Sequence, residues 1–180
     1  MIEFIGRSCC CSYRVGIFEK YLDGCRDYIE IGSLFGGSAV AVGQIVTGEV
    51  HCVDPMNGYR FEGEPDPNVG IVPSPQIIRA NWENAGLDPA RLHLHPQKTP
   101  PLPARLNARE FDAAYIDGDH SFDAVMMDWI LLHNRIRNVI IFDDIGIKAG
   151  PRKVVDILAD HASDEWKLVH NEVMGVFRRV

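Results

Sequence analysis

The stretch Tyr28–Ser38, which reads YIEIGSLFGGS, decides the fold of this chain. It opens with an apolar run typical of a buried β-strand, interrupted by the carboxylate of Glu30. Three glycines then mark a turn, namely Gly32, Gly36 and Gly37. The apolar residues that follow are typical of a helix, so we expect a strand, a glycine turn and a helix amino terminus in direct succession.

Such a turn predicts a site for a nucleotide-like ligand, because glycine lets backbone approach a ligand and the first helical N–H groups are unpaired. A dinucleotide fingerprint needs a second glycine where this chain has Leu34. Glu30 would also repel a pyrophosphate two residues before the first glycine. A ligand with a sulfonium and an amino acid but no phosphate, such as S-adenosylmethionine, tolerates that carboxylate. The alternative is an ordinary strand-to-helix connection without a ligand.

Composition limits the class of protein. The 180 residues are most simply one domain, and the formal charge of −7 argues against a nucleic-acid partner. No segment approaches eighteen consecutive apolar residues, so we expect no membrane span and a cytoplasmic protein. The adjacent Cys9, Cys10 and Cys11 match no zinc spacing, and we expect reduced thiols there.

Segments typical of strands alternate along the chain with segments typical of helices. This order predicts an α/β fold with a doubly wound, mostly parallel sheet and helices on both faces. The expected strands cover 27–32, 49–54, 91–95, 111–116 and 138–142, and the expected helices cover 37–47, 74–86, 121–136 and 150–162. Residues 166–170 and 173–179 predict a C-terminal antiparallel hairpin that closes one edge.

The whole chain, 1–180, is expected to form a single domain. Residues 1–26 are expected to be helical or irregular. Residues 55–73 are rich in glycine, proline and acids, and predict a lid-like loop over a ligand.

Carboxylates follow four of the predicted strands, and ligands of open parallel sheets bind beyond those strand ends. Glu30 ends the first strand, and Asp54 ends the second, where it could take both ribose hydroxyls of an adenosine. The alternative for Asp54 is a turn-forming role before Pro55.

Asp117, Asp143 and Asp144 are candidate ligands for a hard divalent cation such as Mg²⁺. Helix capping is the alternative for Asp143 and Asp144, but the next predicted helix begins too far along the chain. His120 is the candidate general base, since it follows a strand end beside this acidic group. Its alternative is a helix-start residue with no chemical role.

Three motifs together carry a resemblance to a known family. They are EIGSLFGGS at 30–38, DGDH at 117–120 and FDD at 142–144. In this order and at these strand ends they resemble the class I, Rossmann-like S-adenosylmethionine-dependent methyltransferases. The nearest subgroup is the macrocin O-methyltransferase type with the cephalosporin-hydroxylase type, and catechol O-methyltransferase is similar more distantly.

The resemblance implies a seven-stranded sheet with an antiparallel last strand. It also implies that Asp117, Asp143 and Asp144 hold magnesium and that His120 is the base. The donor-binding residues expected from the resemblance and from the turn are Glu30, Gly32, Ser33, Gly36, Gly37, Ser38, Asp54 and Asp117.

The resulting hypothesis is metal-assisted methylation of a hydroxyl oxygen on a small molecule, sugars included. The first alternative is a donor-binding protein without catalysis, motivated by the little material available before the first strand to cap a substrate pocket. The second is an NAD-binding Rossmann protein, which Leu34 disfavours. A homodimer formed through the final hairpin is a further option.

Overall fold

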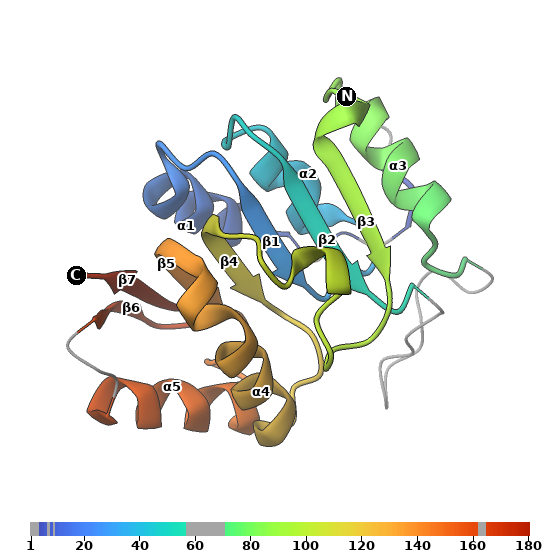
Figure 1. The fold of residues 1–180 in the computed structure, drawn as a ribbon. Coiled ribbons are helices and arrows are strands. Elements are labelled where there is room, and N and C mark those ends of the chain that lie inside the picture. The colour runs from blue at the N-terminus through green and yellow to red at the C-terminus, as the bar shows by residue number, and fades with distance from the viewer. Residues whose placement is uncertain (1–3, 7, 9, 57–70, 162–164) are drawn as a thin grey trace.

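The computed structural model describes residues 4–6, 8, 10–56, 71–161 and 165–180. In this part of the chain seven strands form one sheet with helices on both faces (Figure 1). The strands are β1 (Tyr28–Ile31), β2 (Val50–Asp54), β3 (Leu92–Pro96), β4 (Phe111–Ile116), β5 (Ile136–Phe142), β6 (Trp166–Asn171) and β7 (Gly175–Arg179). The α-helices are α1 (Ser12–Leu22), α2 (Gly37–Gly43), α3 (Pro75–Asn84), α4 (Phe122–Leu132) and α5 (Ala149–His161). Short 3₁₀ turns are η1 (Pro89–Arg91), η2 (Ala104–Leu106) and η3 (His133–Arg135).

The strand order is β3-β2-β1-β4-β5-β7-β6. Strands β1 to β5 pair in parallel, whereas β7 runs antiparallel to both β5 and β6. This topology confirms the predicted fold class, including the C-terminal hairpin. The order reverses between β1 and β4, so a ligand crevice is expected beyond the carboxyl ends of these two strands.

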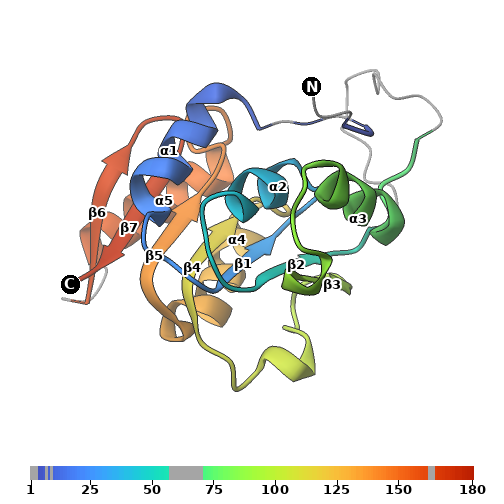
Figure 2. The same cartoon turned by 90° about the horizontal axis from the view of Figure 1, so that it is seen from above.

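Two hydrophobic cores separate the layers, because successive side chains of a strand point to opposite faces. Helices α1, α2 and α3 lie side by side on one face (Figure 2) and pack there against residues such as Tyr28 and Tyr115. Helices α4 and α5 cover the other face, which includes Ile29 and Phe142. Because both faces are covered, the central strands are apolar at nearly every position.

Local signals fix where the helices begin. The side chain of Ser74 accepts a hydrogen bond from the Ile77 amide, and Pro75 occupies the first helical position of α3. Ser121 caps α4 in the same way through the Ala124 amide, as predicted. The bounds differ from expectation mainly at carboxyl ends, where α2 stops at Gly43 and α4 at Leu132.

The amino-terminal segment contributes a defined helix. Expected only as helical or irregular, it contains α1, whose Ile17, Phe18, Tyr21 and Leu22 are buried against the sheet. Most of the predicted lid-like loop, residues 57–70, lies outside the described residues.

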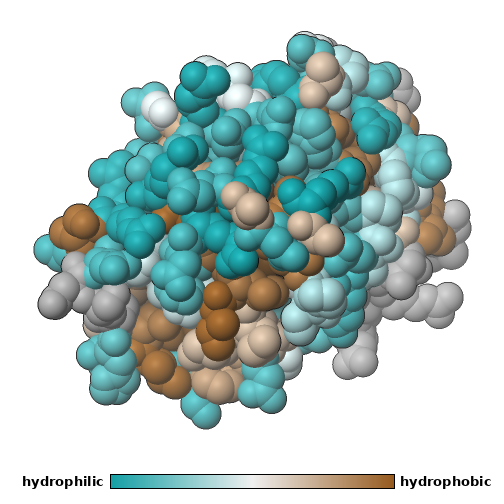
Figure 3. Space-filling view, in the orientation of Figure 1, coloured by the Kyte–Doolittle hydropathy of each residue, from teal (hydrophilic) through white to brown (hydrophobic). Residues whose placement is uncertain are grey.

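The hydrophobic side chains on the face shown in Figure 3 gather in its lower half, where α4 lies in Figure 1. Met127 and Ile130 of that helix are exposed, as is Val169 on the edge strand β6. Dimerisation through the hairpin stays a prediction. Among the described residues, no helix has both the length and the apolar character needed to cross a bilayer.

Replacing Gly32 with alanine is predicted to be far more destabilising than replacing Gly24, although both have a positive φ, of +88° and +79°. At Gly32 the added Cβ would lie 2.0 Å from the backbone oxygen of Asp117, whereas at Gly24 it would meet nothing within 4 Å. Gly24→Ala should therefore cost only the left-handed strain of about 1 kcal/mol, and Gly32→Ala should cost about 3 kcal/mol or more. Chemical denaturation measures both, and equal losses would contradict the packing role of Gly32.

Candidate active site

The candidate site lies at the carboxyl edge of the sheet, around the switch point between β1 and β4. The loop after β1 touches the loop after β4 here, since the Asp117 amide donates to the Ile31 carbonyl at 2.9 Å. The glycines of this turn are required by internal packing as well as by any ligand. A Cβ on Gly36 would press on Ile78, and one on Gly37 would lie 2.6 Å from the hydroxyl of Ser8. Their predicted role in ligand approach stays a prediction.

The turn adopts left-handed backbone at Leu34, with φ +47°, and at Gly36, with φ +82°. Leu34 occupies the position where a dinucleotide fingerprint has glycine, and it takes a glycine-like conformation despite its side chain. Gly36 precedes α2, and its carbonyl accepts from the Val40 amide.

Glu30 is fully buried between the sheet and the helices of one face. The Tyr28 hydroxyl donates to its Oε2 at 3.2 Å, whereas its Oε1 and the nearby Ser33 Oγ have no hydrogen-bond partner among the described residues. Burial raises the pKa of Glu30 to about 7, and the nearby polar side chains of Ser33, Ser38, Cys52 and Tyr28 act in the opposite direction. A buried carboxylate oxygen without a partner is costly, so this geometry fits a ligand that brings a donor, and best a cationic one.

Asp54 closes the glycine turn from the neighbouring strand. Its Oδ2 accepts from the amides of Ser33, at 2.8 Å, and Leu34, at 3.1 Å. Its Oδ1 accepts from the Met56 amide at 2.6 Å, which is the turn-forming role weighed as an alternative. The carboxylate has room for about four hydrogen bonds, so the predicted ribose contact must share it with three backbone donors.

Asp117, His120 and Asp144 come together beyond β4 and β5, and their ligand atoms lie within 4.8 Å of one another. The His120 Nε2 lies 3.3 Å from Asp117 Oδ1 and 3.5 Å from Asp144 Oδ2. Hydrogen bonding to Asp117 raises the pKa of His120, against the effect of burial. Burial raises the pKa of Asp117 to about 7, and the charges of Asp143 and Asp144 add to this.

Asp143 is held differently from its two acidic neighbours. Arg14 of α1 donates through Nε to Asp143 Oδ2 at 2.5 Å and through Nη2 to Asp144 Oδ1 at 2.8 Å. The Tyr115 hydroxyl also donates to Asp143 Oδ2, and Asp143 Oδ1 accepts from the Asp144 amide at 2.7 Å. Arg14 and Tyr115 therefore occupy Asp143 Oδ2, and a metal ion on this oxygen, as the sequence predicts for Asp143, would have to displace them.

Arg14 is the site residue that sequence reasoning missed. It lies nearly 130 residues before its partners, on a segment that contains none of the three motifs. Burial lowers the pKa of its guanidinium, but the hydrogen bond and charge of Asp143 outweigh this and raise it. Arg14 therefore stays a cation among the acids.

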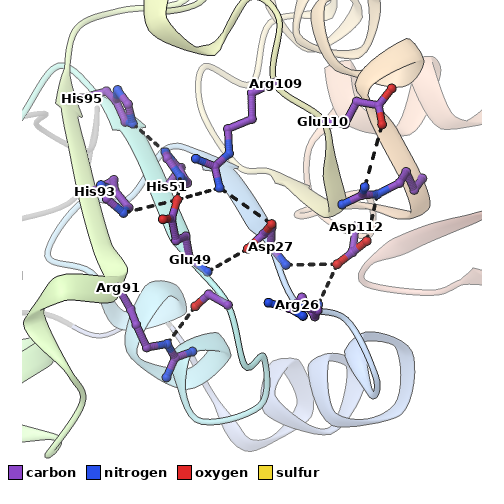
Figure 4. Close-up of polar contacts among 12 residues, drawn as sticks. Arg26, Asp27, Glu49, His51, Arg91, His93, His95, Arg109, Glu110 and Asp112 are labelled. Atoms are coloured by element: carbon purple, nitrogen blue, oxygen red, sulfur yellow. Dashed lines mark hydrogen bonds and ion pairs between the residues drawn. The ribbon is translucent and has the colours of Figure 1, made fainter.

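A second polar group lies toward the opposite, amino edge of the sheet, on β2 and β3 (Figure 4). His51 and His93 are paired across these strands and stack with ring centroids 4.5 Å apart. The Nε2 atoms of His51 and His93 lie 3.1 Å and 3.5 Å from Glu49 Oε2, to which Arg109 also donates at 2.6 Å (Figure 4). Glu49, His51 and His93 have the spacing of possible metal ligands.

Hydrogen-bond directions argue against a metal at this second group. Arg105 Nε can only donate, so the ring atom it contacts, His95 Nδ1, is an acceptor and the proton of His95 is on Nε2. That proton points to His51 Nδ1, at 3.0 Å, which places the proton of His51 on Nε2, facing Glu49. A metal on His51 Nε2 would need this proton moved to Nδ1, against His95. His51 and His95 therefore form a hydrogen-bonded network of neutral histidines.

The comparison with protein families identifies the family to which this fold belongs. A family model described as a methyltransferase domain matches residues 29–145. The chain belongs to this methyltransferase family. The match spans β1 through the end of β5, which includes the glycine turn and all the acids of the candidate site. The finer macrocin-type placement stays a prediction.

Solved structures support the same methyltransferase fold. The O-methyltransferase NovP is 16% identical, with a TM-score of 0.70 over 93% of this chain and 79% of that one. The O-methyltransferase TomG from Streptomyces achromogenes, solved with SAM, is 11% identical, with a TM-score of 0.64 over 96% and 82%. An O-methyltransferase from Bacillus cereus, solved with SAH, is 16% identical, with a TM-score of 0.59 over 94% and 81%. No curated protein matches the chain by sequence.

The neutral histidine network predicts that this methyltransferase loses stability in mild acid. Burial lowers the pKa of His51 to about 4 and that of His95 to about 3. Between pH 6.5 and 4 the unfolded chain binds protons that the folded protein refuses, so stability falls as pH falls. His51 alone should contribute about 3 kcal/mol to this loss.

The measurement is the free energy of unfolding against pH for the wild type, His51→Gln and the control His161→Gln. Glu30 and Asp117 act in the opposite direction because their pKa values are raised, so only the difference between variants isolates the histidine. His51→Gln should reduce the fall in the free energy of unfolding between pH 6.5 and 4, and His161→Gln should not. Parallel curves for the wild type and His51→Gln would contradict the network.

Proposed function

We propose that this methyltransferase transfers the methyl group of S-adenosylmethionine to a hydroxyl oxygen of a small molecule. The observation that carries the proposal is the unpartnered Oε1 of the buried Glu30, beside the unpartnered Oγ of Ser33, at the switch point of the sheet. The amino group of the donor's methionine part supplies the cationic hydrogen-bond donor that this pair of atoms lacks. The SAM- and SAH-bound structures with the same fold support the choice of donor.

The remaining predicted donor contacts come from the same turn and the neighbouring strand ends. Gly32 and Ser33 follow β1, Gly36, Gly37 and Ser38 begin α2, and Asp54 ends β2. We assign the methionine part to the turn and the ribose to Asp54, with Asp117 at the boundary between donor and acceptor. The donor's sulfonium supplies an activated methyl group, so the protein's main task is to position the two reactants.

His120 would act as the general base for the acceptor hydroxyl. Its Nε2 is engaged by Asp117, and its Nδ1 has no partner among the described residues. The acceptor's proton would move to Nδ1 while its oxygen takes the methyl group and the donor's sulfur keeps the bonding electron pair. Asp117 fixes the ring orientation and stabilises the protonated form, because a carboxylate beside an imidazole favours its charged state.

A magnesium ion does not fit this arrangement well. Mg²⁺ prefers oxygen ligands in an octahedral shell, whereas the group formed by Asp117, His120 and Asp144 includes a nitrogen and excludes Asp143. No step of the proposed reaction therefore depends on a metal. Magnesium at Asp117, Asp143 and Asp144 remains the competing hypothesis.

Glu30→Gln tests the donor site. The amide keeps the size of the side chain but removes the charge that pairs with an ammonium group, so the affinity for S-adenosylhomocysteine should fall about 10- to 100-fold. Methylthioadenosine lacks the amino acid part, and its affinity should stay unchanged. Calorimetry measures both ligands on both proteins. If the affinities for the two ligands fell equally, or neither fell, the methionine part would not bind at Glu30.

His120→Gln tests the base. Turnover should fall about 10²- to 10⁴-fold, the usual contribution of a positioned base, while affinity for S-adenosylhomocysteine should stay within twofold of wild type. His133→Gln is the matched control, since His133 lies at the far end of α4. A variant that keeps wild-type turnover would exclude His120 as the base.

The activity itself is tested by transfer of a labelled methyl group from S-adenosylmethionine to a panel of sugars, catechols and other small alcohols. Labelled ether products would support the proposal. Tight donor binding without any labelled product would favour a non-catalytic donor-binding protein. Thermal stabilisation by NAD, but not by S-adenosylhomocysteine, would overturn the donor assignment.

A further inference from the structure

Arg14 lies between Asp143 and Asp144, two of the three acids that the sequence predicts as metal ligands. Its guanidinium bridges Asp143 and Asp144, with contacts of 2.5 Å and 2.8 Å, and the side chain is only 17% exposed. The Asp143 side chain is 1% exposed and the Asp144 side chain 12%. A planar fork that bridges two buried carboxylates is a strong and directional pairing.

Part of the negative charge of the site is therefore neutralised without an added ion. Asp117, Asp143 and Asp144 provide the carboxylates, and among the described residues Arg14 and His120 are the basic groups that touch them. A divalent cation bound at Asp144 would lie beside the guanidinium, which would repel it. Removing Arg14 would leave two buried carboxylates without their cation, and such a pair attracts a metal.

Helix α1 has further anchors that hold it in place without Arg14. Its apolar face, including Phe18 and Leu22, is fully buried. The Tyr13 hydroxyl also contacts His170 Nε2 at 2.8 Å on β6. Exchange of Arg14 should therefore alter the charge of the site more than the docking of the helix.

We propose that Arg14 is a built-in cation that replaces a divalent metal in this methyltransferase and excludes one from Asp143 and Asp144. This proposal rests on the proposed function only where enzyme activity is measured; the metal-binding test does not depend on it. Arg14 is a positioning residue here: it holds the carboxylates in place so that Asp117 and His120 face the acceptor. The protein should then methylate in the presence of a chelator, unlike a metal-dependent enzyme.

The test is titration with Mn²⁺ alone, followed by electron paramagnetic resonance, for the wild type, Arg14→Gln and Arg14→Lys. The wild type should bind Mn²⁺ weakly, Arg14→Gln at least about tenfold more tightly, and Arg14→Lys like the wild type, because a neighbouring cation opposes the ion. Arg137→Gln is the control. It also removes an arginine from a carboxylate, Asp112, but away from the site, and should leave Mn²⁺ affinity unchanged.

Two results would overturn the proposal. One is tight Mn²⁺ binding by the wild type, which needs no variant to fold. The other is equal affinity in the wild type and a folded Arg14→Gln protein, whose fold is checked by circular dichroism and thermal melting. If Arg14→Gln does not fold, Arg14→Lys and the wild type still decide, since tight Mn²⁺ binding by either would contradict the proposal.

Activity adds a second, separate readout. With a chelator present, wild-type turnover should be unchanged, whereas Arg14→Gln should lose turnover and regain part of it with Mn²⁺. Loss of wild-type turnover on chelation would contradict the role of Arg14 but leave the methyl-transfer function intact. Absence of turnover under all conditions would contradict the function, while the Mn²⁺ titration would still decide the role of Arg14.

Discussion

The structure of the site depends on keeping several carboxylates together at one edge of a parallel sheet. The topology forces this crowding, because the carboxyl ends of β1, β4 and β5 lie side by side. Carboxylates crowded at one edge repel one another strongly unless cations or hydrogen-bond donors lie between them. In this protein the intervening groups are its own: Arg14 and Tyr115 on Asp143, and His120 between Asp117 and Asp144. The geometry of the candidate base follows from that neutralisation.

The same constraint links the amino-terminal helix to the chemistry. Helix α1 packs its apolar face on the sheet and places Arg14 at the site, so a segment outside the matched family region completes the acidic edge. Glu30 is the contrasting case. The Tyr28 hydroxyl donates to one oxygen of its carboxylate, and the other oxygen has no hydrogen-bond partner in the described part of the chain. The carboxylates of Asp143 and Asp144 thus have partners within the protein, whereas Glu30 still lacks a hydrogen-bond donor for one oxygen.

Much of the fold could be predicted because the signals are local. A few neighbouring residues are enough to indicate a short apolar strand, the helix caps at Ser74 and Ser121, or the two strands at the carboxyl terminus. The positions of Glu30, Asp117 and Asp144 at strand ends also followed, since the order of the motifs places them on one edge. These residues do lie at the expected edge, although their roles toward a donor or a metal are proposals.

The remaining features depend on contacts between distant segments. Nothing near Arg14 in the chain indicates that it bridges Asp143 and Asp144. The pairing of His51 with His93 requires the register of β2 and β3, which the spacing within either strand does not contain. The tight fit of Gly32 against the Asp117 backbone was equally hidden, because a turn glycine has the same sequence signal whether it faces a ligand or the protein.

The most direct test of the account is a crystal structure of the wild-type protein soaked with S-adenosylhomocysteine and Mn²⁺, with anomalous data collected for the metal. The account predicts the ligand's amino group within about 3.2 Å of Glu30 Oε1, Arg14 still on Asp143 and Asp144, and no anomalous peak between the acids. A manganese peak between Asp117 and Asp143 with Arg14 displaced, or the ligand bound away from the glycine turn, would contradict it.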